Sequence, residues 1–348
     1  MRSQHIVPAA LLALTLLVMG GCAKNPVTEA NAAAKRYFDA WLQLNHPDAT
    51  PTGIGIYIIE QTEGSGTAYS SDATHAMVRY TIRNLEGKIS ETNFEAVAQQ
   101  LGTFNSTYYY GPKVLETASQ FAGVEAALSG MRIGGRRKVI IPSWLMSRTR
   151  YDSAAEYLQH ETGNANAIYD IELCDFTSDI YQWEVDSIVG YVARHMDGID
   201  STYVGGDTTA QKYGFYYQLL RESPDTVTIP SDSTFYINYT GRLLNGQVFD
   251  TTIADTAKVH GIYSASRSYV PISCTKGDKY TEVKINVDGT SASTVVGGFG
   301  GAIFLMQPYE KARTVFYSPL GYAATGGSNT LQLPPYSPLC FEIELVDP

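Results

Sequence analysis

The sequence contains one pattern twice, and this repeat constrains the fold more than any other feature. Residues 55–59 (GIYII) resemble residues 214–218 (GFYYQ), and residues 80–89 (YTIRNLEGKI) resemble residues 239–248 (YTGRLLNGQV). Both pairs are separated by 159 positions. A constant separation over two distant segments is hard to obtain by chance, so the chain is expected to fold as two units of one architecture.

A third repeated pair, residues 168–173 and 340–345, is separated by 172 positions, so the second copy carries about a dozen extra residues. Each copy is typical of antiparallel strands joined by tight turns. The Asn-Gly pair at 245–246 tolerates positive φ and predicts a turn, and the alternation over 339–345 predicts a terminal strand. An apolar run over 299–306 predicts one buried helix. Each copy is therefore expected to be α+β, an antiparallel sheet wrapped on one short helix.

Two further helices are predicted outside the copies. In residues 27–45, alanine and aromatic residues recur at helical spacing, which predicts an N-terminal amphipathic helix. Residues 179–195 show the same periodicity and join the two copies. We expect the apolar positions of this linker helix to pack against a domain rather than to bind a partner.

The N-terminus has the features of a targeting segment. Arg2 precedes an apolar stretch, residues 6–19, of signal-peptide length, and small residues then lead to Cys22. This arrangement resembles the lipobox of bacterial lipoproteins, which implies cleavage before Cys22 and lipidation of that cysteine. Several acyl chains make a stable membrane anchor. The alternative is an ordinary signal peptide followed by an incidental cysteine.

The residue that follows the lipidation site indicates the membrane in which a lipoprotein is anchored. By the same resemblance, Ala23 in place of Asp favours the outer membrane, with the periplasmic and external faces both left open.

Charge and composition exclude several classes of protein. The formal net charge is −10 without a basic block, whereas nucleic-acid binding requires clustered Lys and Arg. The six His residues show no metal spacing, and the three remaining Cys residues form neither a zinc motif nor a disulfide framework. Gly297 to Gly301 lacks the setting of a dinucleotide site. We expect no metal and no cofactor.

The second copy resembles the FKBP-type peptidyl-prolyl cis–trans isomerases over residues 213–348, because several motifs occur in the family's order. They are Tyr-Thr-Gly at 239–241, Gly-Gln-Val-Phe-Asp at 246–250, Val-Val-Gly-Gly-Phe at 295–299, Ser-Pro-Leu-Gly-Tyr-Ala-Ala-Thr-Gly at 318–326, Leu-Pro-Pro at 333–335 and Phe-Glu-Ile-Glu-Leu at 341–345. Together with the N-terminus, they resemble a Bacteroidetes-like lipoprotein with two tandem FKBP-like domains.

The resemblance implies a pocket for a prolyl peptide bond. Its catalytic residues would be Tyr239, Phe249, Asp250, Phe299, Tyr322 and Phe341, and its substrate-binding residues Val295, Val296 and Leu333. By the resemblance Phe299, where the family usually has Trp, is the floor, and Tyr239, Phe249 and Phe341 are the walls. The Val296 N–H and the Tyr322 hydroxyl would hold substrate carbonyls. Asp250 would orient the Tyr239 hydroxyl.

These residue types suit the reaction. Rotation about a peptide bond meets a barrier of about 18–20 kcal/mol that is set by amide resonance. The rotation needs no nucleophile or metal. An apolar aromatic cage lowers the barrier by removing water that stabilises the planar amide and by fitting the twisted form better.

The first copy departs from this pattern. Ser90 and Glu91 stand at the Phe249 and Asp250 positions, and Val124 stands at the Phe299 position. We therefore expect an FKBP-like unit without most of the catalytic cage. Three roles for it stay open: it holds unfolded chains, pairs with a partner, or only orients the second domain.

In the second copy, residues 252–282 are longer than the family's link. This segment is expected beside the pocket, and it gates the pocket, binds clients or is inert.

The expected organisation is a signal peptide at 1–21, a lipidated tether with the N-terminal helix at 22–52, a degenerate FKBP-like domain at 53–177, a linker helix at 178–208 and an isomerase domain at 209–348. The expected function is prolyl isomerisation that assists the folding of cell-envelope proteins. Its expected partners are Pro-containing peptide segments, the membrane through Cys22, and an FK506-like inhibitor, but no nucleic acid. The alternative is a non-catalytic FKBP-like chaperone or interaction lipoprotein.

Overall fold

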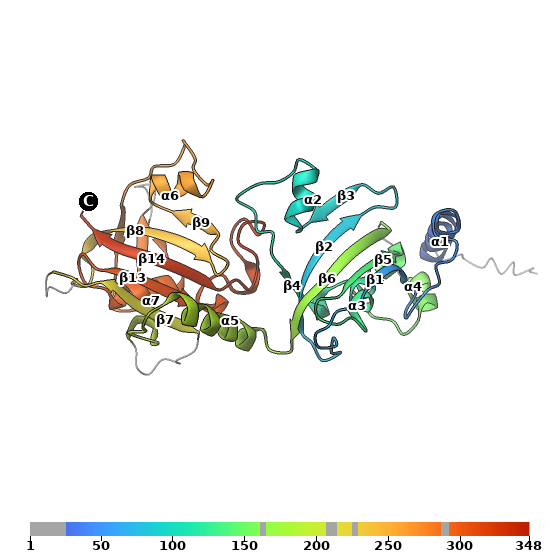
Figure 1. The fold of residues 1–348 in the computed structure, drawn as a ribbon, viewed down its shortest axis with the longest axis horizontal. Helices are drawn as coiled ribbons and strands as arrows, with labels where there is room; N and C mark the ends of the chain where they lie inside the picture. The colour runs from blue at the N-terminus through green and yellow to red at the C-terminus, as the bar shows by residue number, and fades with distance from the viewer. Residues whose placement is uncertain (1–25, 161–164, 207–213, 225–228, 287–291, 348) are drawn as a thin grey trace, which may run out of the picture.

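The computed structural model describes residues 26–160, 165–206, 214–224, 229–286 and 292–347 as two units that lie side by side (Figure 1). The predicted signal peptide and the predicted lipidation site at Cys22 lie outside the described residues. Within the described part of the chain, no helix is both long and apolar enough to cross a membrane.

The first unit is built on an antiparallel sheet, of which six strands fall in the described residues. They are β1 (Tyr57–Thr62), β2 (His75–Arg83), β3 (Ile89–Thr92), β4 (Lys113–Glu116), β5 (Arg136–Ile141) and β6 (Ala167–Thr177). Their order is β1-β5-β6-β2-β3, and β4 also pairs with β2. Helix α3 (Ala122–Leu128) packs against β5.

The second unit has the same plan with additional strands. Its sheet comprises, among the residues that the structure describes, β7 (Phe215–Arg221), β8 (Thr234–Leu243), β9 (Val248–Thr251), β10 (Ile272–Thr275), β11 (Lys284–Asn286), β12 (Ser293–Thr294), β13 (Lys311–Phe316) and β14 (Leu339–Val346). The order is β12-β11-β10-β8-β14-β13-β7, with β9 on β8. Helix α7 (Gly297–Leu305) packs against β13.

The repeat in the sequence is a repeat in the topology. The path β1-β5-β6-β2-β3 corresponds to β7-β13-β14-β8-β9, and the registers agree: Tyr80 lies opposite Ile171, and Tyr239 lies opposite Ile343. In β14, Phe341 and Ile343 are buried while Glu342 between them is half-buried, as the period of two in a strand requires. The α+β class predicted from the sequence is confirmed.

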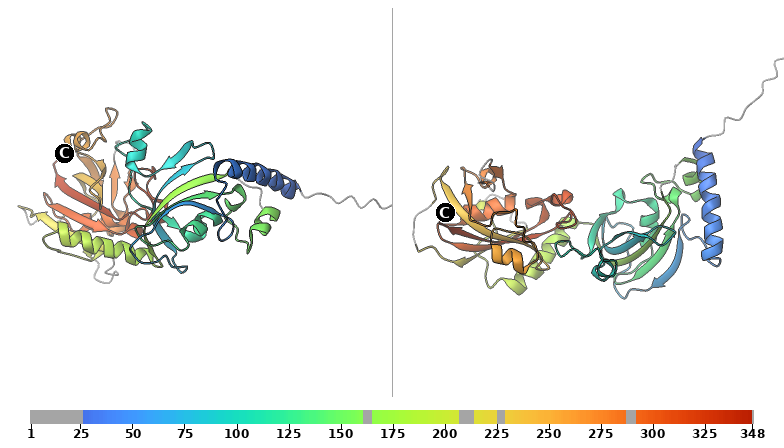
Figure 2. Two further views of the ribbon diagram at one scale, coloured as in Figure 1. Left: turned by 45° about the vertical axis from the view of Figure 1, so that its right-hand side comes forward. Right: turned by 90° about the horizontal axis from the view of Figure 1, so that it is seen from above.

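Two longer helices flank these sheets. Helix α1 (Pro26–Asn45) buries Phe38 against Tyr57 and Trp144 of the first unit. Helix α5 (Ile180–His195) begins after Asp179, whose side chain accepts the N–H of Gln182 as an N-cap. Figure 2 shows α1 at the outer end of the first unit and α5 along the second.

Helix α5 is attached to the second sheet rather than exposed between the units. Ile188 and Tyr191 pack with Val315 and Cys340 of that sheet. Most apolar positions of the helix therefore pack against a domain, whereas Val189 is exposed.

The segment 252–282 contains regular structure. It holds helix α6 (Ala254–Val259) and strand β10, which pairs with β8 and so belongs to the sheet. Shorter helices α2 (Glu95–Gln100) and α4 (Ala154–His160) lie in the first unit.

Candidate functional site

A pocket of about 270 Å³ lies between the second sheet and α7. Its lining includes eight of the nine residues that the sequence predicted for the site: Tyr239, Phe249, Asp250, Val295, Val296, Phe299, Tyr322 and Phe341. Ile285, Ser293 and Thr294, which the sequence did not single out, complete the lining. The ninth predicted residue, Leu333, does not line this pocket and is buried in the core of the unit.

Aromatic rings from four elements meet edge to face in this pocket. Phe299, on α7, packs against Tyr239 of β8 with ring centroids 5.5 Å apart and against Phe341 of β14 at 5.0 Å. Phe249, on β9, packs against Phe341 at 5.6 Å and 89°. Such arrangements are the favoured ones for aromatic pairs. The rings hold one another in place, which leaves a stiff apolar cage.

A glycine in β8 allows two of these rings to meet. A Cβ atom at Gly241 would lie 2.7 Å from Phe249 and 2.7 Å from Phe341. The Tyr-Thr-Gly motif therefore has a steric basis, because a side chain at the third position would displace both rings.

One polar group projects from the cage wall. The Tyr239 hydroxyl donates to Asp250 Oδ2 at 2.5 Å, and Arg267 pairs with the other oxygen of the same carboxylate. Burial and the neighbouring Asp250 raise the pKa of Tyr239, so its hydroxyl keeps its proton at neutral pH. Burial alone would lower the pKa of Arg267, but Asp250 outweighs it and the guanidinium stays charged.

Arg267 is the member of this network that the sequence reasoning missed. It lies between α6 and β10, in the segment whose role the sequence left open. A single arginine in a polar segment carries no sequence signal of its own, because only the path of the chain brings it to Asp250.

Two groups at the pocket are available to a ligand. Tyr322 is 39% exposed, and its hydroxyl has no hydrogen-bond partner among the described residues. The main-chain N–H of Val296, the residue that precedes α7, likewise has no acceptor in the part of the chain that the structure describes. A carbonyl oxygen of a bound peptide could accept from either.

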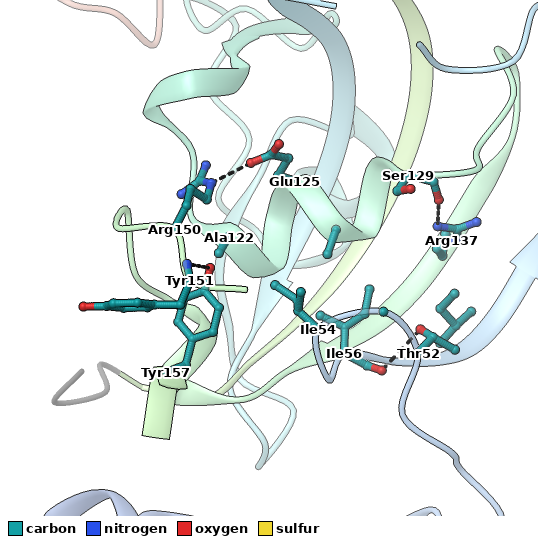
Figure 3. Close-up of a pocket in the computed structure, with 13 residues that line it drawn as sticks. Thr52, Ile54, Ile56, Ala122, Glu125, Ser129, Arg137, Arg150, Tyr151 and Tyr157 are labelled. Carbon is teal, nitrogen blue, oxygen red and sulfur yellow. Dashed lines mark hydrogen bonds and ion pairs between the residues drawn. The ribbon is translucent and has the colours of Figure 1, made fainter. Parts of the chain in front are cut away.

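A second hollow, of about 420 Å³, lies in the first unit between α3 and the segment that leads into β1 (Figure 3). Its charged groups are paired: Glu125 with Arg150 at 2.7 Å, and Arg137 with the carbonyl oxygens of Ala127 and Ser129 at 2.7 and 2.8 Å. Arg137 thus caps the end of α3, which gives this cation a structural role.

The aromatic pocket of the second unit therefore has the features of a binding site for a compact apolar group. It contains no paired nucleophile and base, and no cluster of metal-ligating side chains occurs among the described residues. An aromatic cage with hydroxyl groups in its lining can bind and desolvate an apolar ligand.

One comparison with known proteins covers the part of the chain that contains this pocket. Residues 226–346 match the model of the family described as FKBP-type peptidyl-prolyl cis-trans isomerase. This segment runs from before β8 to the end of β14 and holds the whole cage. No curated protein matches the chain.

Several solved structures are similar at low identity. The three FKBP domains of wheat FKBP73 are 17% identical with a TM-score of 0.30, covering 84% of this chain and 94% of that one. A peptidyl-prolyl cis-trans isomerase from Pseudomonas syringae is 20% identical with a TM-score of 0.31, and the match covers 48% of this chain and 91% of that one. FkpA from Escherichia coli is 18% identical with a TM-score of 0.29, and the match covers 43% of this chain and 61% of that one. At these values the likenesses carry no functional weight.

Proposed function

We propose that the second unit is a peptidyl-prolyl cis–trans isomerase and that the aromatic pocket is its active site. The observation that carries the proposal is the cage itself: Phe299, Tyr239, Phe249 and Phe341 enclose an apolar space beside a proton-bearing hydroxyl. The match of residues 226–346 to the isomerase family supports the same activity.

The cage acts on the prolyl bond by excluding water. An X–Pro bond isomerises unassisted in tens to hundreds of seconds. In this proposal the proline ring lies on Phe299, between Tyr239 and Phe341. The planar amide there loses the water that stabilises its charge separation, and the twisted amide is stabilised relative to it.

The polar groups of the pocket orient the peptide. The N–H of Val296 and the hydroxyl of Tyr322 donate to carbonyl oxygens on either side of the proline. Asp250 and Arg267 fix the direction of the Tyr239 hydroxyl, which is thereby presented to the reacting amide in one orientation.

The test is an isomerisation assay on the full chain without residues 1–22, with an apolar-X-Pro peptide and with and without FK506. The wild type should accelerate isomerisation, and FK506 should inhibit it. The double variant Phe249→Ala, Asp250→Ala removes one wall and the partner of Tyr239, and should lose about 100-fold or more in kcat/KM. The matched control Ser90→Ala, Glu91→Ala changes the corresponding positions of the first unit and should leave the rate unchanged.

Two results would contradict the proposal. Unchanged activity in the double variant would remove the assignment of the pocket. A folded chain that binds unfolded protein without accelerating isomerisation would instead be a non-catalytic chaperone of FKBP-like fold.

We propose further that the protein is anchored to the cell envelope, at the outer membrane, by lipid on Cys22, and that its substrates are Pro-containing segments of envelope proteins. The lipobox-like sequence before Cys22 supports this location. Cells grown with labelled palmitate should label the protein, and Cys22→Ala should abolish both the label and membrane recovery. A labelled Cys22→Ala variant would exclude this anchor.

A further inference from the structure

The first unit has its own hollow at the place that corresponds to the aromatic pocket. It measures about 160 Å³ and lies between α3, β2 and β6. Its lining includes Tyr80, Ile82, Glu91, Leu115, Val124 and Tyr169. The hollow is therefore a retained cavity rather than a filled core.

The polar network of the second pocket is repeated in this hollow. The Tyr80 hydroxyl donates to Glu91 Oε1 at 2.6 Å, as Tyr239 donates to Asp250. Lys113 Nζ lies 3.0 Å from the same Glu91 oxygen, in the role that Arg267 has for Asp250. Glu91 is thus neutralised by Lys113, so the mouth of the hollow carries no unpaired charge from this pair and suits a neutral ligand.

The strands beneath the two tyrosines are held alike. The hydroxyls of Thr81 and Thr92 lie 2.9 Å apart, as do those of Thr240 and Thr251. The main-chain N–H of Tyr80 donates to the side chain of Asn93, just after β3, and that of Tyr239 donates to the side chain of Thr252, just after β9. The same contacts therefore hold the tyrosine in the same position in both units.

The apolar walls differ between the two sites. Ile82 stands where β8 has Gly241, so the space that the Phe249 ring uses in the second unit is occupied by an aliphatic side chain. Val124 replaces the aromatic floor. Without a ring at this position, the floor of the hollow offers no aromatic counterpart of Phe299 to a proline ring.

Tyr169 adds a group that the second pocket lacks. It stands at the Phe341 position, and its hydroxyl has no hydrogen-bond partner among the described residues. Burial and then Glu91 raise the pKa of Tyr169 to about 12, so this hydroxyl remains a donor at neutral pH. This donor faces an open hollow and is accessible to a ligand, and the carbonyl oxygen of an extended peptide is a neutral acceptor for it.

We infer that this hollow is a second peptide site, which takes one apolar side chain of Leu or Phe size from an unfolded segment while Tyr169 donates to the main chain beside it. The volume is sufficient, since a dry cavity of about 150 Å³ accommodates benzene. The site binds without isomerising, and its ligand requires no proline. The inference goes beyond the proposed isomerase and does not depend on it.

The test uses the full chain without residues 1–22 and a proline-free peptide of Gly, Ser and Thr with one central photo-leucine and a terminal fluorophore. Binding is followed by anisotropy, and light-induced cross-links are mapped by mass spectrometry. The cross-links should fall on β2, α3 or β6.

Three variants locate the binding. Leu115→Trp fills the hollow from the edge strand β4 and should weaken binding about tenfold or more. Tyr169→Phe removes only the hydroxyl and should weaken it about three- to tenfold, the range for one hydrogen bond. Leu44→Trp, at an 85% exposed position on α1, is the matched control and should bind like the wild type.

The double variant Phe249→Ala, Asp250→Ala separates this site from the isomerase pocket and should bind the probe unchanged. The inference is overturned if cross-links fall on residues 239–341, if Tyr169→Phe binds like the wild type, or if no saturable binding occurs up to about 1 mM peptide. If Leu115→Trp does not fold, the binding of Tyr169→Phe and the positions of the cross-links show whether the peptide occupies the hollow. Loss of isomerase activity alone contradicts only the proposed function.

Discussion

The main-chain N–H of Tyr109, in the first unit, donates to the carbonyl oxygen of Leu331, in the second, at 2.7 Å. The next residue, Gln332, donates its side-chain amide to the carbonyl oxygen of Phe249 at 2.9 Å. The Tyr109 side chain also packs against the core of the second unit. A loop of the first unit therefore supports the loop that holds one wall of the isomerase pocket.

Other contacts join the same two regions. Gln247 Nε2 donates to the carbonyl oxygen of Thr107 at 3.1 Å, in the turn between β8 and β9. The first unit thus contacts the second at loops that flank the pocket, and removal of the first unit would remove these contacts from the loops.

Tyr109→Ala should lower kcat/KM for isomerisation about three- to tenfold, mainly through KM, because the loop that holds Phe249 loses part of its packing. A tenfold change corresponds to about 1.4 kcal/mol, which is within the range for a truncated contact residue. Tyr37→Ala, on α1, is the control and should have no effect. Equal kinetics for both variants would show that the first unit does not support the pocket.

Gly241→Ala should impair the isomerase while the sheet still forms. The added methyl would lie 2.7 Å from both Phe249 and Phe341, so the rings must move and the cage loses its shape. We expect a loss of about tenfold or more in kcat/KM and a decrease of about 1–3 kcal/mol in the free energy of unfolding.

Gly190→Ala provides the contrast, because a Cβ in the middle of α5 would meet only the end of Arg194, at 3.4 Å. This variant should gain up to about 1 kcal/mol of stability and retain full activity. Equal activity of Gly241→Ala and Gly190→Ala would contradict the steric role of Gly241.

The α+β class, the repeated architecture and most of the pocket lining could be predicted from the sequence, the pocket through its resemblance to a known family. The separation of 159 positions between Tyr80 and Tyr239 indicates the repeat, and the pairing of these residues with Ile171 and Ile343, which are 172 positions apart, agrees with the extra residues in the second copy. Phe249, Asp250 and Phe299 could be placed because each lies in a short motif next to a turn or a helix start. These residues are identified by the resemblance of their motifs to those of the isomerase family, in the same order along the chain.

The remaining features depend on contacts between distant segments. Arg267 reaches Asp250 only because α6 and β10 direct the chain back to the pocket, and β10 itself was not anticipated in a polar stretch. In the first unit, the sequence predicts the loss of most of the catalytic cage but gives no indication of the hollow beside Val124 or of its polar network. Lys113, on β4, shows no sequence relation to Arg267, although both neutralise the same kind of carboxylate.

Arg267→Gln should reduce kcat/KM about three- to tenfold without a large loss of stability. The pair with Asp250 is about one-third exposed on both sides, so its contribution to stability is under about 1 kcal/mol. Its effect on catalysis is larger, because Asp250 then turns more freely and the Tyr239 hydroxyl loses its fixed direction. Lys113→Gln, the matched change in the first unit, should leave isomerisation unaltered. A reduced rate in both variants would contradict a local effect at Asp250.

Glu184 makes stability depend on pH. This side chain of α5 is fully buried, and its two oxygens accept the N–H and the hydroxyl of Ser318 at 2.6 and 2.7 Å. Burial raises the pKa of Glu184 to about 7, although the bonds from Ser318 act in the opposite direction. In the unfolded chain this carboxyl titrates near its ordinary value of about 4.3.

The sign of the pH dependence follows from these two values. Between about pH 4.3 and 7 the folded state holds a proton that the unfolded state has released, so the free energy of unfolding falls as the pH rises through this window. Above pH 7 Glu184 is a buried carboxylate in the folded protein, and the free energy of unfolding no longer falls with pH on its account. Glu184→Gln keeps an acceptor for Ser318 and removes the titration.

Urea unfolding at pH 5, 6, 7 and 8 tests this assignment. Glu184→Gln should be close to the wild type at pH 5 and more stable by about 2 kcal/mol at pH 8, because only the wild type must bury a charge there. Glu222→Gln, at an exposed position beyond β7, is the control and should follow the wild-type curve. If the curves for wild type and Glu184→Gln run parallel from pH 5 to 8, the folded protein does not take up a proton at Glu184, and the carboxylate is accommodated by Ser318 alone.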